Sequence, residues 1–243
     1  MRMMTFAKRC VKEILRDPMN LVFGLGFPIV LLLLMSAIQA NIPVVLFEIE
    51  RLAPGIAVFG LSFMTLFSAT LVAKDKESAF LQRLYTTPLK ASDFIVGYMV
   101  PMIPIAVGQS SVCCLVAIML GLPVSIHILY GVLMGIPVAV FYISLGLLCG
   151  GLLNVKAVGG LCGALLTNLS GWFSGVWFDL ELVGGVFGKI AKVLPFAHAV
   201  EMERALIRGE FANALPHCYP VLAYAAVTMV AAIWCFLRQM QRQ

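Results

Sequence analysis

The sequence predicts an all-α membrane protein with six transmembrane helices. Of its 243 residues, 61% are hydrophobic and only 12% are charged, whereas a soluble domain carries about 25% charged residues. The mean hydropathy is +0.99, and the apolar residues form long blocks that do not alternate in polarity as the strands of a membrane barrel do. Helices that span a bilayer are therefore the expected fold.

Residues 2–17 precede the first apolar block and are predicted to form an amphipathic helix at the membrane interface. At about 100° per residue, the charged side chains fall on one side of this helix and the apolar ones on the other. The charged side holds Arg2, Lys8, Arg9, Lys12, Glu13 and Arg16. A basic amphipathic helix suits the surface of a bilayer with anionic headgroups. Asp17-Pro18 should end it, because the residue before proline disfavours helical geometry.

Six apolar blocks that can cross a membrane follow within one transmembrane domain, residues 1–243. Their expected bounds are 20–38, 53–73, 94–121, 128–152, 157–178 and 219–237. The third block contains Pro101 and Pro104, which membrane helices tolerate where neighbours satisfy the freed carbonyls. Glycines are frequent in the fourth and fifth blocks, which indicates close helix packing or, alternatively, a hinge.

The distribution of basic residues predicts that both termini are cytoplasmic. With six spans, one side of the membrane holds twelve Lys and Arg residues and the other side holds five. Basic residues favour the cytoplasmic side. The net charge of +5 is therefore explained by topology, and no nucleic-acid partner is implied.

Two polar segments separate the blocks. Residues 74–93 begin with Lys74-Asp75-Lys76-Glu77, and Thr87-Pro88 should end a short helix there. Asp75 and Glu77 are expected in the first turn of that helix, where they favour its dipole. In the external segment 179–218, apolar residues recur at helical spacing, so part of it is expected to re-enter the outer leaflet.

No motif for chemistry occurs in the sequence. It lacks a phosphate-binding loop GxxxxGK[ST], HExxH and GxSxG, and no Asp or Glu lies inside the six predicted spans. Ion-coupled carriers usually hold such residues in the membrane. The seven cysteines form no metal-binding pattern. We expect no catalytic residues and no metal site, so uphill transport would need energy from another polypeptide.

The segment 74–93 resembles the cytoplasmic coupling region of ABC-2 type exporter permeases. The shared features are a charged run, the Leu-x-x-Leu step of Leu81 and Leu84, and then Thr87-Pro88. The similarity extends over nearly the whole chain, including the N-terminal helix, six spans and Leu194-Pro195-Phe196. Ala79 stands where the family often has glycine.

This resemblance implies a permease that exports an amphipathic or apolar substrate, such as a drug, a lipid or a peptide-like molecule. A separate ABC ATPase subunit would bind ATP and Mg²⁺, so this chain would hold no cofactor, and a second permease would complete the complex. The expected location is the cell (inner) membrane of a bacterium. An ATP-independent facilitator or an integral membrane enzyme is the alternative. An ordinary solvated loop is the alternative for segment 74–93.

The resemblance also assigns roles to individual residues. The coupling residues would be Lys74, Asp75, Glu77, Leu81, Leu84, Thr87 and Pro88. The second and fifth spans would line the translocation path with Phe59, Phe63, Thr65, Phe67, Asn168, Ser170, Trp172 and Phe173. An aromatic lining with a few polar groups suits an amphipathic substrate. The alternative for each of these aromatic residues is packing or contact with lipid.

Overall fold

The computed structural model describes residues 2–18, 22–42, 47–78, 80–85 and 90–241. Every regular element in these ranges is a helix, which confirms the all-α fold. Five helical stretches are long and apolar enough to cross a membrane: Val22–Asn41, Ile49–Glu77, Ala91–Met119, Ile126–Leu152 and Phe211–Gln241.

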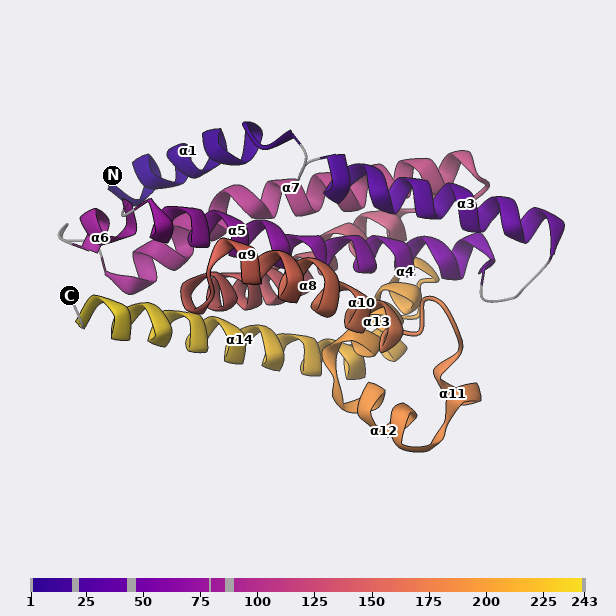
Figure 1. Cartoon of the computed structure of the whole chain (residues 1–243). Coiled ribbons are helices and arrows are strands. Elements are labelled where there is room, and N and C mark those ends of the chain that lie inside the picture. The colour runs from indigo at the N-terminus through magenta and orange to yellow at the C-terminus, as the bar shows by residue number, and fades with distance from the viewer. Residues whose placement is uncertain (1, 19–21, 43–46, 79, 86–89, 242–243) are drawn as a thin grey trace.

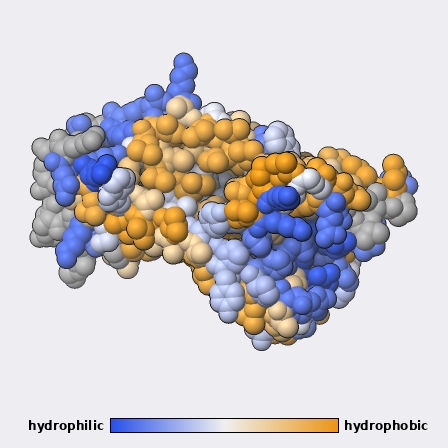
Figure 2. Space-filling model, turned by 90° about the horizontal axis from the view of Figure 1, so that it is seen from below, coloured by the Kyte–Doolittle hydropathy of each residue, from blue (hydrophilic) through white to orange (hydrophobic). Residues whose placement is uncertain are grey.

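The long helices lie side by side, and both termini lie at the same end of the bundle (Figure 1). That end also holds α6 (Phe80–Tyr85), whereas α11 (Leu180–Val183) and α12 (Gly185–Val193) lie toward the opposite end. The face in Figure 2 is hydrophobic over much of its middle, and hydrophilic residues gather toward the ends. This polarity suits a membrane-spanning bundle, although the cytoplasmic position of the termini stays a prediction.

Helix α1 (Arg2–Leu15) has the predicted amphipathic character. Phe6, Ala7, Cys10 and Ile14 are buried, and the ring of Phe6 packs edge-on against Phe94 and Tyr98 of α7 (Ala91–Met119). Figure 1 shows α1 alongside the bundle. The apolar side of α1 therefore faces protein, and its placement at the membrane interface stays a prediction.

The second predicted span forms two helices, α4 (Ile49–Leu61) and α5 (Phe63–Glu77). They meet at Ser62, whose hydroxyl donates to the Phe59 carbonyl at 2.6 Å. Asp75 and Glu77 lie in the last turn of α5, so their expected position in the first turn of a separate helix was wrong. The α5 helix continues because Lys74 and Lys76 favour its C-terminal dipole and because the charged side chains find partners across the bundle.

The centre of the bundle is the close contact of α5 with α8 (Ile126–Leu152). A Cβ on Gly146 would lie 2.3 Å from the Thr65 carbonyl oxygen, and one on Gly150 would lie 2.5 Å from the Ala69 carbonyl oxygen. Only glycine allows this approach. The packing interpretation of these glycines is therefore confirmed for the fourth predicted span.

The fifth predicted span is irregular. It forms α9 (Val155–Val158), a π-helix η3 (Gly159–Leu166) and α10 (Thr167–Trp172). It is absent from the five membrane-crossing stretches found in the described residues. Glycines and polar residues lower the hydropathy of this segment, and its 18 residues would extend about 27 Å even as a regular α-helix. Six spans therefore stay a prediction, whereas five long apolar helices are present.

The segment 179–218 contains α11, α12, α13 (Pro195–Ile207) and the start of α14 (Phe211–Gln241). Helix α13 packs against α4, α8 and α14, and most of it is buried. The apolar residues of α11 and α12 are largely exposed at the surface. The last span begins at Phe211 instead of at residue 219, because the chain resumes a helix soon after the left-handed turn at Gly209 (φ +78°).

Candidate coupling site

The charged turn Lys74–Glu77 at the end of α5 is the point where four other helices or their flanking residues meet. Lys74 binds the segment that follows α1, and Asp75 binds the middle of α1 and α7. Lys76 binds the end of α8, and Glu77 binds the start of α9. We name these four residues the α5 junction. The structure shows that this turn holds the helix ends of its own chain together, and its binding of a partner stays a prediction.

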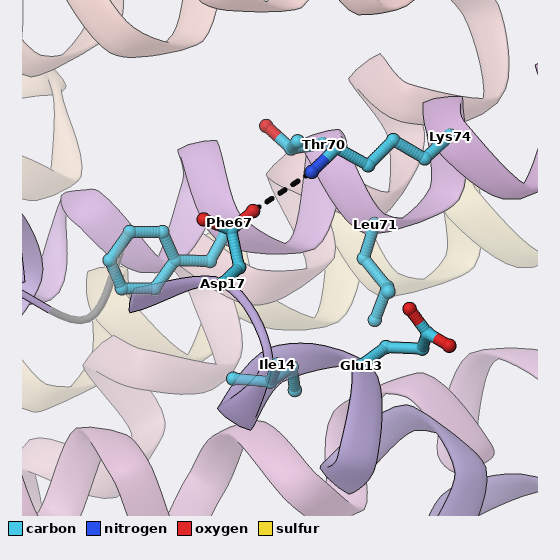
Figure 3. Close-up of a pocket in the computed structure, with 7 residues that line it drawn as sticks. All are labelled: Glu13, Ile14, Asp17, Phe67, Thr70, Leu71 and Lys74. Atoms are coloured by element: carbon cyan, nitrogen blue, oxygen red, sulfur yellow. Dashed lines mark hydrogen bonds and ion pairs between the residues drawn. The ribbon is translucent and has the colours of Figure 1, made fainter. Parts of the chain in front are cut away.

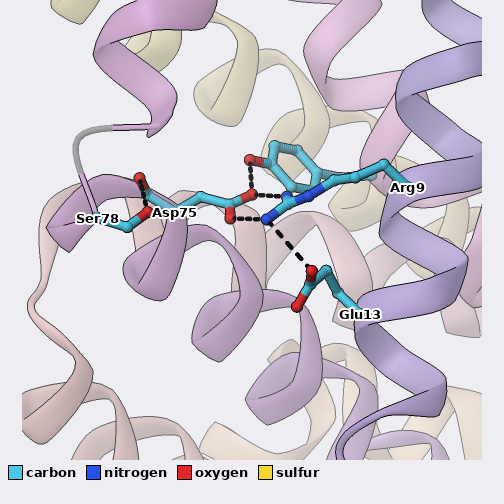
Figure 4. Close-up of polar contacts among 5 residues, drawn as sticks. Arg9, Glu13, Asp75 and Ser78 are labelled. Atoms are coloured by element: carbon cyan, nitrogen blue, oxygen red, sulfur yellow. Dashed lines mark hydrogen bonds and ion pairs between the residues drawn. The ribbon is translucent and has the colours of Figure 1, made fainter.

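Asp75 is the buried centre of the α5 junction, with 2% of its surface exposed. Both guanidinium amino groups of Arg9 donate to its carboxylate, one of them to Oδ1 at 2.6 Å. The Tyr98 hydroxyl donates to Asp75 Oδ2 at 2.7 Å. Figure 4 shows this cluster, with Glu13 on the outer side of Arg9 at 4.0 Å. The contacts join α1, α5 and α7, and a bidentate pair of this kind fixes their relative orientation.

The electrostatics of α1 follow from this cluster. Burial lowers the pKa of Arg9, but the hydrogen bonds and charge of Asp75 outweigh that effect and raise the pKa overall. Burial raises the pKa of the neighbouring Cys10 thiol to about 12. Arg9 is therefore cationic and Cys10 is a neutral thiol at physiological pH.

Lys74 connects α5 to the residues after α1. Its ammonium group donates to the Asp17 carboxylate at 2.8 Å, and this exposed pair lies over a cleft of about 40 Å³ between the two helices (Figure 3). Glu13 and Ile14 of α1 and Phe67 and Leu71 of α5 line that cleft. An exposed pair contributes little free energy, so we regard it as an outer contact of the junction.

Lys76 and Glu77 connect α5 to the link between α8 and α9. The Lys76 ammonium group donates to the carbonyl oxygens of Gly151 at 2.9 Å and Leu153 at 2.7 Å. Glu77 Oε1 accepts a hydrogen bond from the backbone N–H of Val155 at 2.9 Å. The Lys76 cation thus binds carbonyls at the C-terminal end of α8, and the Glu77 carboxylate binds the first N–H group of α9. The helix dipole favours both contacts.

The short helix predicted after the charged turn is α6. Leu81, one of the predicted coupling residues, is 1% exposed and belongs to the core, so its side chain packs inside this chain. The Arg9 guanidinium carbon lies 4.3 Å from the centre of the Phe80 ring, which links α6 to the same buried ion pair. The side chain of Leu84, and both Thr87 and Pro88, lie outside the described residues.

The predicted path residues do not line one cavity in the described part of this chain. The rings of Phe59 and Phe63 lie 6.0 Å apart, and Phe59 also packs against Trp177 at 5.3 Å. Phe67 lines the cleft near α1, and Phe173 stacks on Phe187 at 4.4 Å.

The polar members of the predicted path fall into two groups. Thr65 donates to the Tyr142 carbonyl at 3.0 Å, and the Ser170 hydroxyl forms a hydrogen bond with the Tyr142 hydroxyl. Both hydroxyls are therefore buried and already hydrogen-bonded inside the bundle. Asn168 and Trp172 are exposed on η3–α10.

Sequence reasoning missed several residues that the structure brings into buried polar contacts. Arg9 was assigned only to the charged side of α1, and Tyr98 carried no signal because it lies within an apolar block. Arg204 is buried at the other end of the bundle, where it binds the Glu201 carboxylate at 2.7 Å. The i, i+3 spacing of Glu201 and Arg204 predicts this pair, and what the sequence did not show is that Arg204 is buried.

The described residues contain no group of three His, Cys, Asp or Glu side chains that could hold a metal ion. The assignment of ATP and Mg²⁺ to a partner subunit stays a prediction.

No curated protein matches the chain. The family model described as ABC-2 type transporter matches residues 1–207, which include α1, the α5 junction and α13. The chain therefore belongs to the ABC-2 type transporter family, which comprises membrane permeases of ABC transporters.

Proposed function

We propose that this chain is the permease of an ATP-driven exporter, and that a separate ABC ATPase subunit binds ATP and Mg²⁺ and hydrolyses the nucleotide. Membership of the ABC-2 family supports a transport component that works with an ATPase and is not itself catalytic. The single observation that carries the mechanism is the α5 junction, because one turn of helix there binds α1, α7, α8 and α9.

The ATPase would act on the end of the bundle that holds both termini and α6. Lys8 and Lys12 on α1 and Arg16 directly after it are exposed, so they offer a basic surface to a partner. A movement of α1 or α6 would reach α5 through Arg9, which binds Asp75 and also lies over Phe80. Of the predicted coupling residues, Lys74, Asp75 and Glu77 would pass this movement on, and Leu81 would hold α6 to the core.

The movement would continue into the irregular segment α9–η3–α10. Glu77 binds the first turn of α9, and η3 is a π-helix, a form that often occurs at functional sites. Gly160, Ala164, Asn168 and Trp172 recur at every fourth position and are all exposed. This face would meet a second permease, with the translocation path between the two chains.

The aromatic residues on α4 and α5 suggest the class of substrate. Phe59, Phe63, Phe27 and Trp177 form a connected set of edge-on ring contacts. Aromatic surfaces with few polar groups suit an amphipathic or apolar molecule. The direction of transport is proposed as outward, from the cytoplasm.

The test is purification of the tagged chain from its native membrane in mild detergent, followed by mass spectrometry and an ATPase assay. We expect a stoichiometric ABC ATPase whose hydrolysis rate changes when the permease is present. Inside-out vesicles that hold the complex should accumulate a fluorescent amphipathic dye when ATP is added. Accumulation without ATP, or a purified oligomer without an ATPase, would contradict the proposal and favour a facilitator.

A further inference from the structure

A second polar cavity lies at the end of the bundle away from the termini, and the proposed function does not use it. Its volume is about 360 Å³, within the range of small-ligand sites. The start of α4, the loop after α10, and helices α11 to α14 enclose it. Its charged and histidine lining residues are Arg51, Asp179, Glu181, Lys192, His198, Glu201, Arg204 and His217.

The lining of this cavity holds two guanidinium groups, buried Arg204 and half-buried Arg51, and the partly exposed carboxylate of Glu201. Each of the three guanidinium nitrogens of Arg204 donates one hydrogen bond: Nη1 to Glu201 at 2.7 Å, Nε to the Arg51 carbonyl at 3.1 Å and Nη2 to the Gly175 carbonyl at 3.1 Å. The guanidinium of Arg51 differs at Nε. Its Nε is buried and has no acceptor among the described residues. A buried donor of this kind favours an anionic ligand with several oxygens.

The two histidines of the cavity are already engaged with each other. His198 Nδ1 and His217 Nδ1 lie 2.9 Å apart, and His198 Nε2 donates to the Lys192 carbonyl at 2.9 Å. Both ring nitrogens of His198 and Nδ1 of His217 are therefore already hydrogen-bonded. The remaining acids of the cavity, Asp179 and Glu181, are exposed.

A strongly apolar surface continues directly from the cavity. Leu182 is 87% exposed and Val186 is 74% exposed, and both follow Glu181 closely in sequence. The other exposed apolar residues of α11 and α12 are Val183, Ile190 and Val193. We name these five residues the apolar rim. An apolar rim beside a charged cavity matches an amphipathic molecule with its head in the cavity and its chains on the rim.

We propose that this cavity binds the phosphate headgroup of a membrane glycerophospholipid, with the phosphate on Arg51 and the acyl chains against the apolar rim. Arginine binds phosphate oxygens through two parallel N–H donors. The inference goes beyond the proposed function, because it requires neither ATP hydrolysis nor transport. Free phosphate shares the same head chemistry, and the experiment separates the two.

The experiment is native mass spectrometry of the purified chain in detergent, titrated with dioleoyl phosphatidylglycerol, with dioleoylglycerol, or with inorganic phosphate. We expect the phosphatidylglycerol to bind at least about tenfold more tightly than dioleoylglycerol, which lacks the phosphate. Arg51→Gln should remove that advantage. Its fold should persist, because the Arg51 backbone carbonyl, which Arg204 binds, is retained.

Matched variants decide the outcome. Arg208→Gln removes a charge from the same end of the bundle but outside this cavity, and it should leave the affinity within about twofold. Val186→Asp should weaken lipid binding without a change in phosphate binding. Equal loss in Arg51→Gln and Arg208→Gln would overturn the site. Tight binding of inorganic phosphate that phosphatidylglycerol does not displace would overturn the lipid as its ligand.

Discussion

Arg9 and Asp75 form a bidentate ion pair between residues 66 positions apart in the sequence, with Asp75 buried and Arg9 partly exposed. The pair makes α1 part of the bundle, because Asp75 also accepts a hydrogen bond from Tyr98 of α7. A force on α1 therefore acts on α5 and α7 at once. Asp75 was expected to contact the ATPase at the protein surface. Because it is buried, its carboxylate instead connects α5 to α1 and α7 inside this chain.

Loss of Arg9 should destabilise the fold. Arg9→Met leaves the Asp75 carboxylate buried without its cation, and removal of one partner from a buried pair costs about 3 kcal/mol. We expect a clear drop in the thermal unfolding temperature of the purified protein in detergent. Lys8→Met is the matched control, since it removes the same charge from an exposed position. A similar drop in both variants would mean that the pair has no special role.

Loss of the Glu77 contact should affect coupling more than stability. Glu77→Ala removes the acceptor for the Val155 N–H, and the loss of such an N-terminal contact costs about 1 kcal/mol. The junction with α9 would then be loose, so the permease should stimulate its ATPase several-fold less. Glu77→Gln keeps an acceptor oxygen and should keep most of the stimulation. If the two variants stimulate equally, the contact does not transmit movement.

The sequence was sufficient to predict the fold class. Runs of about twenty apolar residues form helices in a membrane, because every backbone N–H and C=O group must find a hydrogen-bond partner within the protein. The sequence also singled out the charged turn 74–77, whose coupling role stays a prediction. It could not show that this turn faces inward, since the partners Arg9, Tyr98, Gly151 and Val155 are distant in sequence and meet only after the helices pack. The π-helix in segment 155–172 could not be predicted either, because composition does not reveal one.

The glycines of α8 and η3 should tolerate substitution very unequally. A Cβ on Gly146 would lie 2.0 Å from Ser68 Oγ and 2.3 Å from the Thr65 carbonyl oxygen, so Gly146→Ala must separate α5 from α8. Overpacking of this kind costs about 2–3 kcal/mol. In η3, a Cβ on Gly160 would meet nothing within 4 Å. Gly160→Ala should leave the unfolding temperature unchanged, and an equal loss in both variants would contradict the packing described here.

Glu203 of α13 should make stability depend on pH. Its side chain is buried, Oε1 has no hydrogen-bond partner among the described residues, and burial raises the pKa of this carboxyl well above its usual value. The folded state therefore holds a proton that the unfolded chain releases near pH 4.3. This contribution to stability is complete below about pH 4.3 and is lost as the pH rises toward the folded pKa.

The substitution Glu203→Gln keeps the shape of the neutral acid and removes its titration. We expect the variant to gain stability over the wild type as the pH rises from 5 to 8, measured as the difference in unfolding temperature at each pH. Glu210→Gln changes an exposed carboxylate nearby and should show no such trend. A constant difference between Glu203→Gln and the wild type across this range would mean that Glu203 is ionised in the folded protein.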